Sequence, residues 1–156
     1  MTQPMLPAGT LHDQVAIITG GGTGMGKAMA LNFAQLGAKI VVASRKLENL
    51  EATVREIEAA GGEALAVQTD VRDPAQVANM VERTKERFGG IDILINNAAG
   101  NFVARAEDLS PNAWNAVVGI VLNGTWFCTQ AVAKEMMAQG RGGKMVNIIA
   151  TYVWTG

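Results

Sequence analysis

The stretch Thr19-Gly20-Gly21-Gly22-Thr23-Gly24-Met25-Gly26 decides the fold class of this chain. It follows the apolar run Val15 to Ile18 and opens a segment of helical character that reaches Leu36. Glycines let the backbone turn sharply and approach phosphate groups, and a helix N-terminus offers free N–H groups with partial positive charge. A glycine cluster alone is weak evidence, but a strand before it and a helix after it supply the required context. The stretch therefore predicts a dinucleotide-binding turn, against the simpler reading of a glycine-rich surface turn.

The composition is that of one globular domain over residues 1–156, with 49% hydrophobic and 17% charged residues. A net charge of −1 and the absence of a basic stripe argue against nucleic acid as a partner. The apolar runs look too short to span a bilayer, and residues 1–11 lack the pattern of a secretory signal and are expected to form a disordered lead-in. With one histidine and one cysteine, no metal site is expected, and Cys128 is predicted to be a core residue.

Apolar segments alternate with segments of helical spacing along the whole chain. Strands are expected over residues 14–19, 39–43, 63–69, 91–95 and 144–149, and helices over 24–36, 47–60, 74–88 and 110–139. Strands that are apolar throughout indicate a parallel sheet covered on both faces. Right-handed crossovers then predict an α/β fold, a doubly wound parallel sheet of the Rossmann type with strand order 3-2-1-4-5. Ligands bind such sheets at the carboxyl ends of the strands, which directs attention to the residues that follow each strand.

The residues after the second strand favour NADP(H) as the cofactor. An acidic residue at this place binds the ribose hydroxyls of NAD, whereas an arginine accommodates the 2′-phosphate of NADP. Here the chain reads Ser44-Arg45-Lys46, two cations and a hydroxyl, although two solvated basic residues at the start of a helix remain an alternative. Asp70, after the third strand, is expected to accept a hydrogen bond from adenine, to form a turn or to cap the following helix.

With the glycine turn, Asp70-Val71 and Asn96-Asn97-Ala98-Ala99-Gly100 in place, the chain resembles the short-chain dehydrogenase/reductase family from Gln14 to Gly156. The resemblance implies that Asn96 to Gly100 lie beside the nicotinamide-side ribose. The residues expected to bind the cofactor are Thr19, Gly20, Gly22, Thr23, Gly24, Met25, Gly26, Ser44, Arg45, Lys46, Asp70, Val71, Asn97, Ala98, Ala99 and Gly100.

Two departures from the family pattern argue against ordinary carbonyl reduction. Typical members use an Asn–Ser–Tyr–Lys set, in which serine binds the carbonyl oxygen and tyrosine transfers the proton. In this chain Ala150 stands at the serine position, and Val121 stands seven residues after Trp114, where the asparagine is usual. Both positions therefore carry apolar residues.

A sub-family fits these departures. The runs from Asn96 to Phe102, from Leu109 to Trp114 and from Ile120 to Thr125 look like the 2,4-dienoyl-CoA reductases, which use NADPH to reduce a conjugated dienoyl thioester to a 3-enoyl-CoA. The resemblance implies that Asn101 and Tyr152 hold the oxygen of the dienolate, and that Phe102 and Ser110 contact the acyl-CoA. Asparagine and tyrosine are suitable hydrogen-bond donors to an oxyanion, although Asn101 can also serve as a turn residue and Tyr152 as a packing residue.

Several alternatives stay open at this level. They are a trans-2-enoyl-CoA reductase, a 3-oxoacyl or alcohol dehydrogenase that uses Thr151 in place of the serine, and a non-catalytic NADP-binding module. By resemblance, family members continue past the fifth strand, so the chain is expected to be an incomplete reductase whose cofactor lysine lies beyond Gly156. The resemblance also suggests a homotetramer, paired through the helix over 110–139. No targeting signal is apparent, so a bacterial cytoplasm is the expected location.

Overall fold

The computed structural model describes residues 6–102 and 104–149. They form a five-stranded parallel sheet in the order β3-β2-β1-β4-β5, which confirms the predicted fold class. The strands are β1 (Val15–Thr19), β2 (Lys39–Ser44), β3 (Ala64–Gln68), β4 (Ile93–Asn96) and β5 (Lys144–Asn147). The helices are α1 (Gly24–Gln35), α2 (Leu47–Ala59), α3 (Pro74–Phe88), the 3-10 turn η1 (Ala106–Asp108), α4 (Pro111–Val118), the π-helical turn η2 (Gly119–Asn123) and α5 (Gly124–Ala138).

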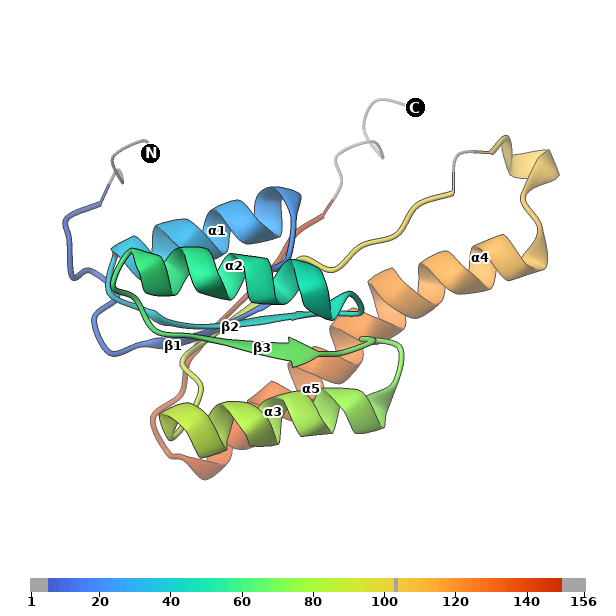
Figure 1. Cartoon of the computed structure of the whole chain (residues 1–156). Helices are drawn as coiled ribbons and strands as arrows, with labels where there is room; N and C mark the ends of the chain where they lie inside the picture. The colour runs from blue at the N-terminus through green and yellow to red at the C-terminus, as the bar shows by residue number, and fades with distance from the viewer. Residues whose placement is uncertain (1–5, 103, 150–156) are drawn as a thin grey trace.

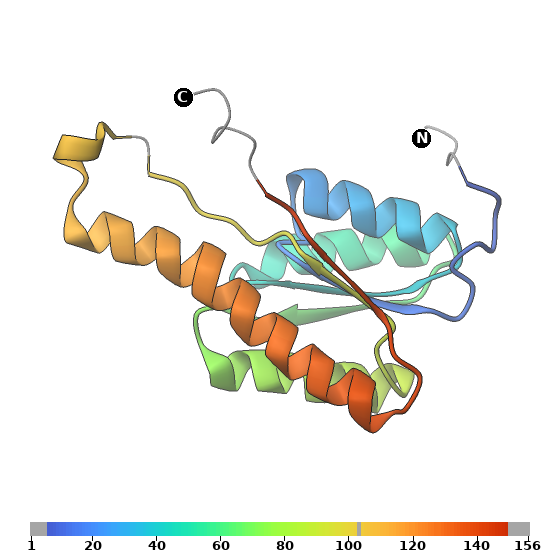
Figure 2. The same ribbon diagram turned by 180° about the vertical axis from the view of Figure 1, so that it is seen from behind.

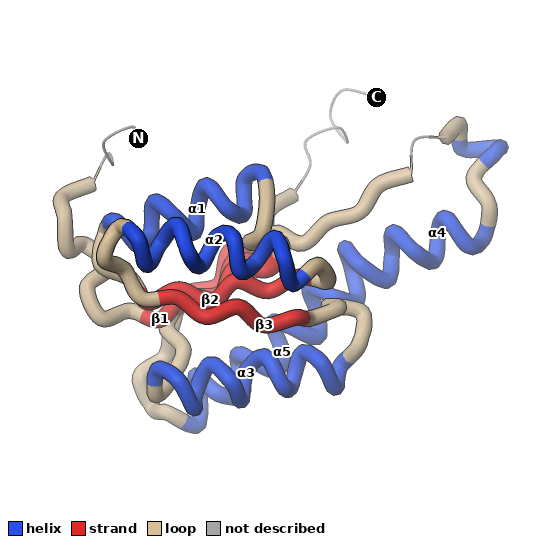
Figure 3. Tube along the Cα trace, viewed as in Figure 1, coloured by secondary structure: helices blue, strands red, loops and turns tan. Residues whose placement is uncertain are grey.

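The sheet is the middle of three layers. Helices α1 and α2 cover one face, and α3 and α5 cover the other (Figures 1 and 3). Successive strand residues point to opposite faces, so β1 contributes to two cores. Ile17 packs with Met80 and Cys128 on the α3/α5 side, and Ile18 packs with Leu50 on the α1/α2 side. Both faces of the three central strands are buried, which explains why β1, β2 and β4 are apolar over most of their length.

The helix ends follow local sequence signals. Gly37, Gly61 and Gly89 have φ values of 95°, 85° and 81°, a left-handed conformation that favours glycine and ends the helix before each of them. At the other end, the Asp73 carboxylate accepts a hydrogen bond from the Ala75 N–H at 2.9 Å and caps α3. These signals are local in sequence, and they account for the agreement between the expected and observed helix boundaries.

Two features differ from the expectations. The lead-in over residues 7–11 contains hydrogen-bonded turns, and the Leu11 N–H donates to the Leu36 carbonyl at 2.9 Å. Leu11 also packs against the core beneath α1, which gives this segment an apolar anchor. The expected helix over 110–139 is continuous but contains the π-helical turn η2, where it crosses the end of the sheet. Figure 2 shows this helix running along the face of the sheet and then beyond it.

The stretch Pro111–Ala138 is long and apolar enough, by length and composition, to cross a membrane, contrary to the expectation from the apolar runs. Length and composition are weak evidence, because a helix that covers a sheet can have the same character. Here Cys128, Val132 and Met136 are buried against the sheet and α3, although the buried share of the apolar window within the described structure is 17%.

Candidate functional site

A cavity of about 220 Å³ opens at the carboxyl ends of β1, β2, β3 and β4. Ten of the residues that the sequence predicts to bind a cofactor line it. The complete lining is Gly20, Gly22, Thr23, Ser44, Arg45, Lys46, Asn49, Thr69, Asp70, Val71, Ala98, Ala99 and Ile120. The strand ends therefore meet where a doubly wound sheet places its ligand.

The glycine turn brings the start of α1 against the end of β1. Gly20 and Gly24 have φ values of 68° and 53°. A Cβ atom on Gly26 would lie 2.2 Å from the carbonyl oxygen of Gly20, so only glycine permits this approach. The Thr23 side chain caps no N–H group of α1, which leaves the first turn of the helix able to bind an anion. This cradle fits a pyrophosphate.

The end of β4 is joined to the glycine turn by a small polar network. The hydroxyl of Thr19 accepts hydrogen bonds from the N–H groups of Asn97 and Ala98, both at 3.0 Å, and donates to the Ile95 carbonyl at 3.3 Å. The Asn97 side chain donates to the Thr19 carbonyl at 2.9 Å. Thr19 is buried and lies outside the cavity lining, so it positions the two strand ends instead of lining the cavity.

The neighbouring Asn96 joins β4 to the other side of the sheet. Its Nδ2 group donates to the Thr129 hydroxyl on α5 at 3.0 Å and to the Asn147 Oδ1 atom on β5 at 2.9 Å. Its buried Oδ1 atom has no hydrogen-bond partner among the described residues. Two consecutive asparagines thus connect the end of β4 to β1 on one side and to β5 and α5 on the other.

The end of β2 presents two cations to the cavity. The Gln68 side chain donates to the Arg45 carbonyl at 2.9 Å, which holds the Arg45 backbone in place. Within the described part of the chain, the side chains of Arg45 and Lys46 form no ion pair. Unpaired cations beside Ser44 are suited to bind a phosphate group.

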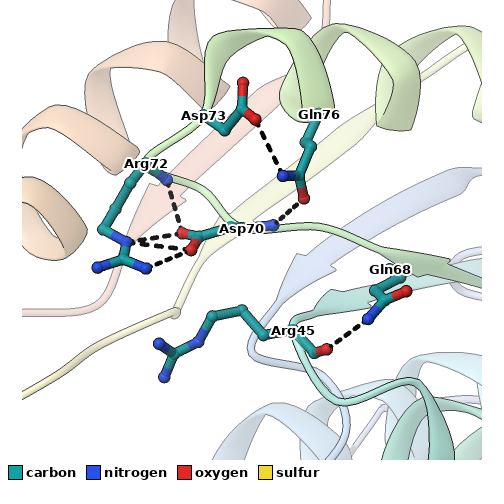
Figure 4. A network of polar contacts seen from close by, with 6 residues as sticks. All are labelled: Arg45, Gln68, Asp70, Arg72, Asp73 and Gln76. Atoms are coloured by element: carbon teal, nitrogen blue, oxygen red, sulfur yellow. Dashed lines mark hydrogen bonds and ion pairs between the residues drawn. The ribbon is translucent and has the colours of Figure 1, made fainter.

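Asp70 lies at the end of β3 and is bound by Arg72, as Figure 4 shows. Its Oδ1 atom accepts from the Arg72 N–H at 3.1 Å and from Arg72 Nε at 2.9 Å, and its Oδ2 atom accepts from Arg72 Nη2. The Arg72 side chain holds the pKa of the Asp70 carboxyl below its usual value. Of the structural roles considered for Asp70, the turn is the one observed, because Asp73 caps α3.

The remaining predicted residues that the structure describes lie outside the cavity lining. Gly24, Met25, Gly26 and Gly100 flank it, and Asn101 and Phe102 follow β4 as exposed residues. The Ser110 hydroxyl accepts from the Ala113 N–H at 3.2 Å and caps α4, as the Ser-Pro pair predicts. Tyr152, Ala150 and Thr151 lie outside the described residues.

Three lining residues were absent from the sequence-based set. Asn49 follows Lys46 by one helical turn and packs against Gly22, and Thr69 directly precedes Asp70. Helical spacing and adjacency are signals that could have identified both. Ile120 belongs to the π-helical turn, and only the path of the long helix across the sheet brings it to the cavity.

Comparison with known proteins agrees with this geometry. Residues 14–153 match the family described as short chain dehydrogenase. The chain belongs to the short chain dehydrogenase family. Members of this oxidoreductase family bind a nicotinamide dinucleotide, and the glycine cradle and strand-end cavity of this short chain dehydrogenase fit such a cofactor.

The chain is similar to curated proteins named as 2,4-dienoyl-CoA reductases. It is 46% identical over 144 residues to a probable 2,4-dienoyl-CoA reductase of Bacillus subtilis named as (2E)-enoyl-CoA-producing, covering 92% of this chain and 57% of the relative. It is 42% identical over 155 residues to probable 2,4-dienoyl-CoA reductase 3 of Caenorhabditis elegans, named as (3E)-enoyl-CoA-producing, covering 98% and 50%. The chain thus spans about half the length of the curated relatives that it matches.

The fold is also similar to that of a solved short chain dehydrogenase. A short chain dehydrogenase from Bacillus anthracis superposes with a TM-score of 0.87 at 52% identity, covering 91% of this chain and 59% of the other. The short chain dehydrogenase fold is therefore shared over nearly the whole of the present chain.

Proposed function

We propose that the protein is an NADPH-dependent reductase that converts 2,4-dienoyl-CoA to 3-enoyl-CoA in the degradation of unsaturated fatty acids. The observation that carries the proposal is the cavity at the strand ends, where the glycine cradle meets Arg45 and Lys46, two cations that form no ion pair within the described ranges 6–102 and 104–149. The names of the relatives support the choice of substrate.

The glycine cradle and the two cations bind different phosphate groups of the cofactor. The N–H groups at the start of α1 bind the pyrophosphate, and Gly26 permits the close packing that brings them there. Ser44, Arg45 and Lys46 bind the 2′-phosphate that distinguishes NADP from NAD. Asn97 and Thr19 hold the end of β4 beside this turn. When bound, NADPH supplies the hydride.

The residues proposed to bind the substrate stabilise charge on its thioester group. Hydride addition to the carbon farthest from the carbonyl in the conjugated system places negative charge on the thioester oxygen, and donors aimed at that oxygen lower the barrier. Asn101 and Tyr152 are the proposed donors, and Phe102 and Ser110 the proposed contacts to the acyl-CoA. The resulting dienolate takes a proton, delivered from water that Tyr152 orients, at C2 to give the 3-enoyl product or at C4 to give the 2-enoyl product. The two products named for the relatives correspond to these alternatives.

The experiment that tests the proposal follows NADPH oxidation at 340 nm with the full-length protein. Turnover is expected with 2,4-hexadienoyl-CoA and little turnover with crotonyl-CoA or acetoacetyl-CoA, with the double bond of the product located by NMR. Preference for crotonyl-CoA would indicate a 2-enoyl-CoA reductase, and preference for acetoacetyl-CoA an ordinary dehydrogenase. Cofactor binding without turnover on any of the three would indicate a non-catalytic module.

Assembly as a homotetramer is part of the same proposal. The helix from α4 to α5 exposes large apolar side chains, including Trp114, Leu122 and Trp126, which are 60%, 65% and 57% exposed. Exposed apolar surface of this kind is typical of an interface with another chain. Light scattering on the full-length protein measures the mass of the assembly.

A further inference from the structure

The carboxylate of Asp70 pairs with Arg72 and shares the cavity with a second arginine, Arg45. Asp70 and Arg45 both line the cavity, and Arg72 approaches Asp70 from the loop that leads into α3. Among the described residues only Arg72 forms an ion pair with this carboxylate. Figure 4 draws the Arg45 side chain beside the same network, and among the described residues no ion pair or hydrogen bond joins it to Asp70. The positive charge of Arg45 nevertheless contributes to the lowered pKa of the Asp70 carboxyl.

The Asp70–Arg72 pair is held by several contacts. Besides the side-chain contacts, the Arg72 N–H donates to Asp70 Oδ1 at 3.1 Å and fixes the carboxylate over its own turn. The Gln76 side chain accepts from the Asp70 N–H at 2.8 Å and donates to Asp73 at 2.9 Å, which ties the turn to α3. A Cβ atom on Gly119 would lie 3.5 Å from Arg72 Cδ, so the arginine stem runs beside the π-helical turn.

We propose that Arg72 is a specificity-determining residue for NADP(H), because it occupies the Asp70 carboxylate and so leaves the Arg45 guanidinium to bind the 2′-phosphate. This inference rests on the proposed assignment of Arg45 to that phosphate. In this proposal Arg72 does not contact the phosphate. It pairs with the Asp70 carboxylate, which would otherwise compete with the phosphate for Arg45. Without Arg72, the carboxylate is free to pair with Arg45 and to repel an incoming phosphate.

The test measures dissociation constants of NADPH and NADH by calorimetry on the full-length protein. Arg72→Met removes the charge and keeps an unbranched stem beside Gly119. NADPH binding is expected to weaken about fivefold, the size of a partly exposed ion pair, and NADH binding to stay within about twofold. Adding Asp70→Asn to Arg72→Met removes the competing carboxylate and is expected to restore the NADPH:NADH affinity ratio, because any contact of Asp70 with adenine is common to the two cofactors. Arg83→Met is the matched control, because Arg83 pairs only weakly with Glu86 on α3, at 3.7 Å.

The outcomes separate this inference from the cofactor assignment. If Arg45→Ala leaves the NADPH:NADH ratio unaltered, the phosphate assignment fails and this inference fails with it. If Arg45→Ala abolishes the preference but Arg72→Met does not change it, the inference alone is overturned. If Arg72→Met lowers the preference and the double variant does not restore it, the proposed competition between the Asp70 carboxylate and the 2′-phosphate for Arg45 is overturned.

A further variant covers the case in which Arg72→Met fails to fold, which thermal unfolding would show. Asp70→Asn alone keeps an acceptor for the Arg72 N–H and deletes the negative charge. The preference for NADPH is then expected to be retained, because Arg45 still has no competitor. A preference lost in Asp70→Asn would overturn the proposal.

Discussion

The side chain of Asn97 donates a hydrogen bond to the carbonyl oxygen of Thr19 at 2.9 Å, across 78 residues of sequence. The same Nδ2 atom is the neighbour that a Cβ on Gly20 would meet at 2.8 Å. Asn97 thus fills the space that the glycine turn leaves open and joins the ends of β1 and β4.

Replacing Asn97 with alanine is expected to lower the free energy of unfolding by about 1–3 kcal/mol, because the partly buried Thr19 carbonyl loses its side-chain donor. Urea denaturation measures the change. Asn32→Ala is the matched control, since Asn32 donates to the Ala28 carbonyl on the exposed side of α1 and should cost less than about 0.5 kcal/mol. Equal effects of the two variants would contradict the role given to Asn97.

Gly26→Ala is expected to weaken NADPH binding and to destabilise the fold by about 1–3 kcal/mol, because the new Cβ would overlap the Gly20 carbonyl and force α1 away from β1. Calorimetry and urea denaturation report the two effects. Gly61→Ala provides the comparison: Gly61 has a φ of 85° and open space around it, so this variant shows the cost of backbone conformation alone. Wild-type NADPH affinity in Gly26→Ala would exclude the close approach as a requirement.

The thiol of Cys128 is expected to react with Ellman's reagent only as the protein unfolds, because the residue is fully buried. Burial raises the pKa of this thiol to about 12, from an ordinary value of 9.0. Between pH 9 and 12 the thiol is therefore ionised in the unfolded chain but protonated in the folded protein. Over this range the free energy of unfolding falls by about 1.4 kcal/mol for each pH unit. Cys128→Ala should lack that part of the alkaline loss, and rapid labelling of the native protein at pH 8 would contradict the burial.

Tyr152→Phe is expected to lower turnover of 2,4-hexadienoyl-CoA by about 10²-fold or more, the effect of losing one oxyanion donor, while NADPH affinity changes little. Stopped-flow absorbance and calorimetry separate the two quantities. Phe102→Leu serves as a companion variant, because it alters the proposed acyl contact and should change KM more than kcat. Unchanged activity in Tyr152→Phe would remove this residue from the site.

The fold could be predicted because its signals are local. Gly37 and Gly89 adopt the left-handed conformation that ends a helix, and Ser110 caps α4 through its own hydroxyl. The carboxyl ends of the strands then bring Gly20, Ser44 and Asp70 to one cavity, as parallel pairing requires.

The rest depended on contacts between distant segments. The sequence leaves three roles open for Asp70, and the partner that selects the turn, Arg72, is identified only by side-chain geometry. Ile120 reaches the cavity because the long helix contains a π-helical turn, and no residue pattern in that segment predicts one. Phe102 and Ser110 lie beyond the cavity lining, so their role in binding the acyl-CoA stays a prediction.

The π-helical turn over Gly119–Asn123 has a consequence for how this region can vary in length. A π turn closes its hydrogen bond over one more residue than an α turn, so it absorbs a single extra residue without rotating the helices on either side. Removing one residue there should convert the segment to regular α-helix and leave Cys128 facing the sheet. The same deletion inside α5 would rotate every later side chain by roughly 100°. Within this helix, one residue can therefore be removed at the π-helical turn beside the cavity without disturbing the packing of the core.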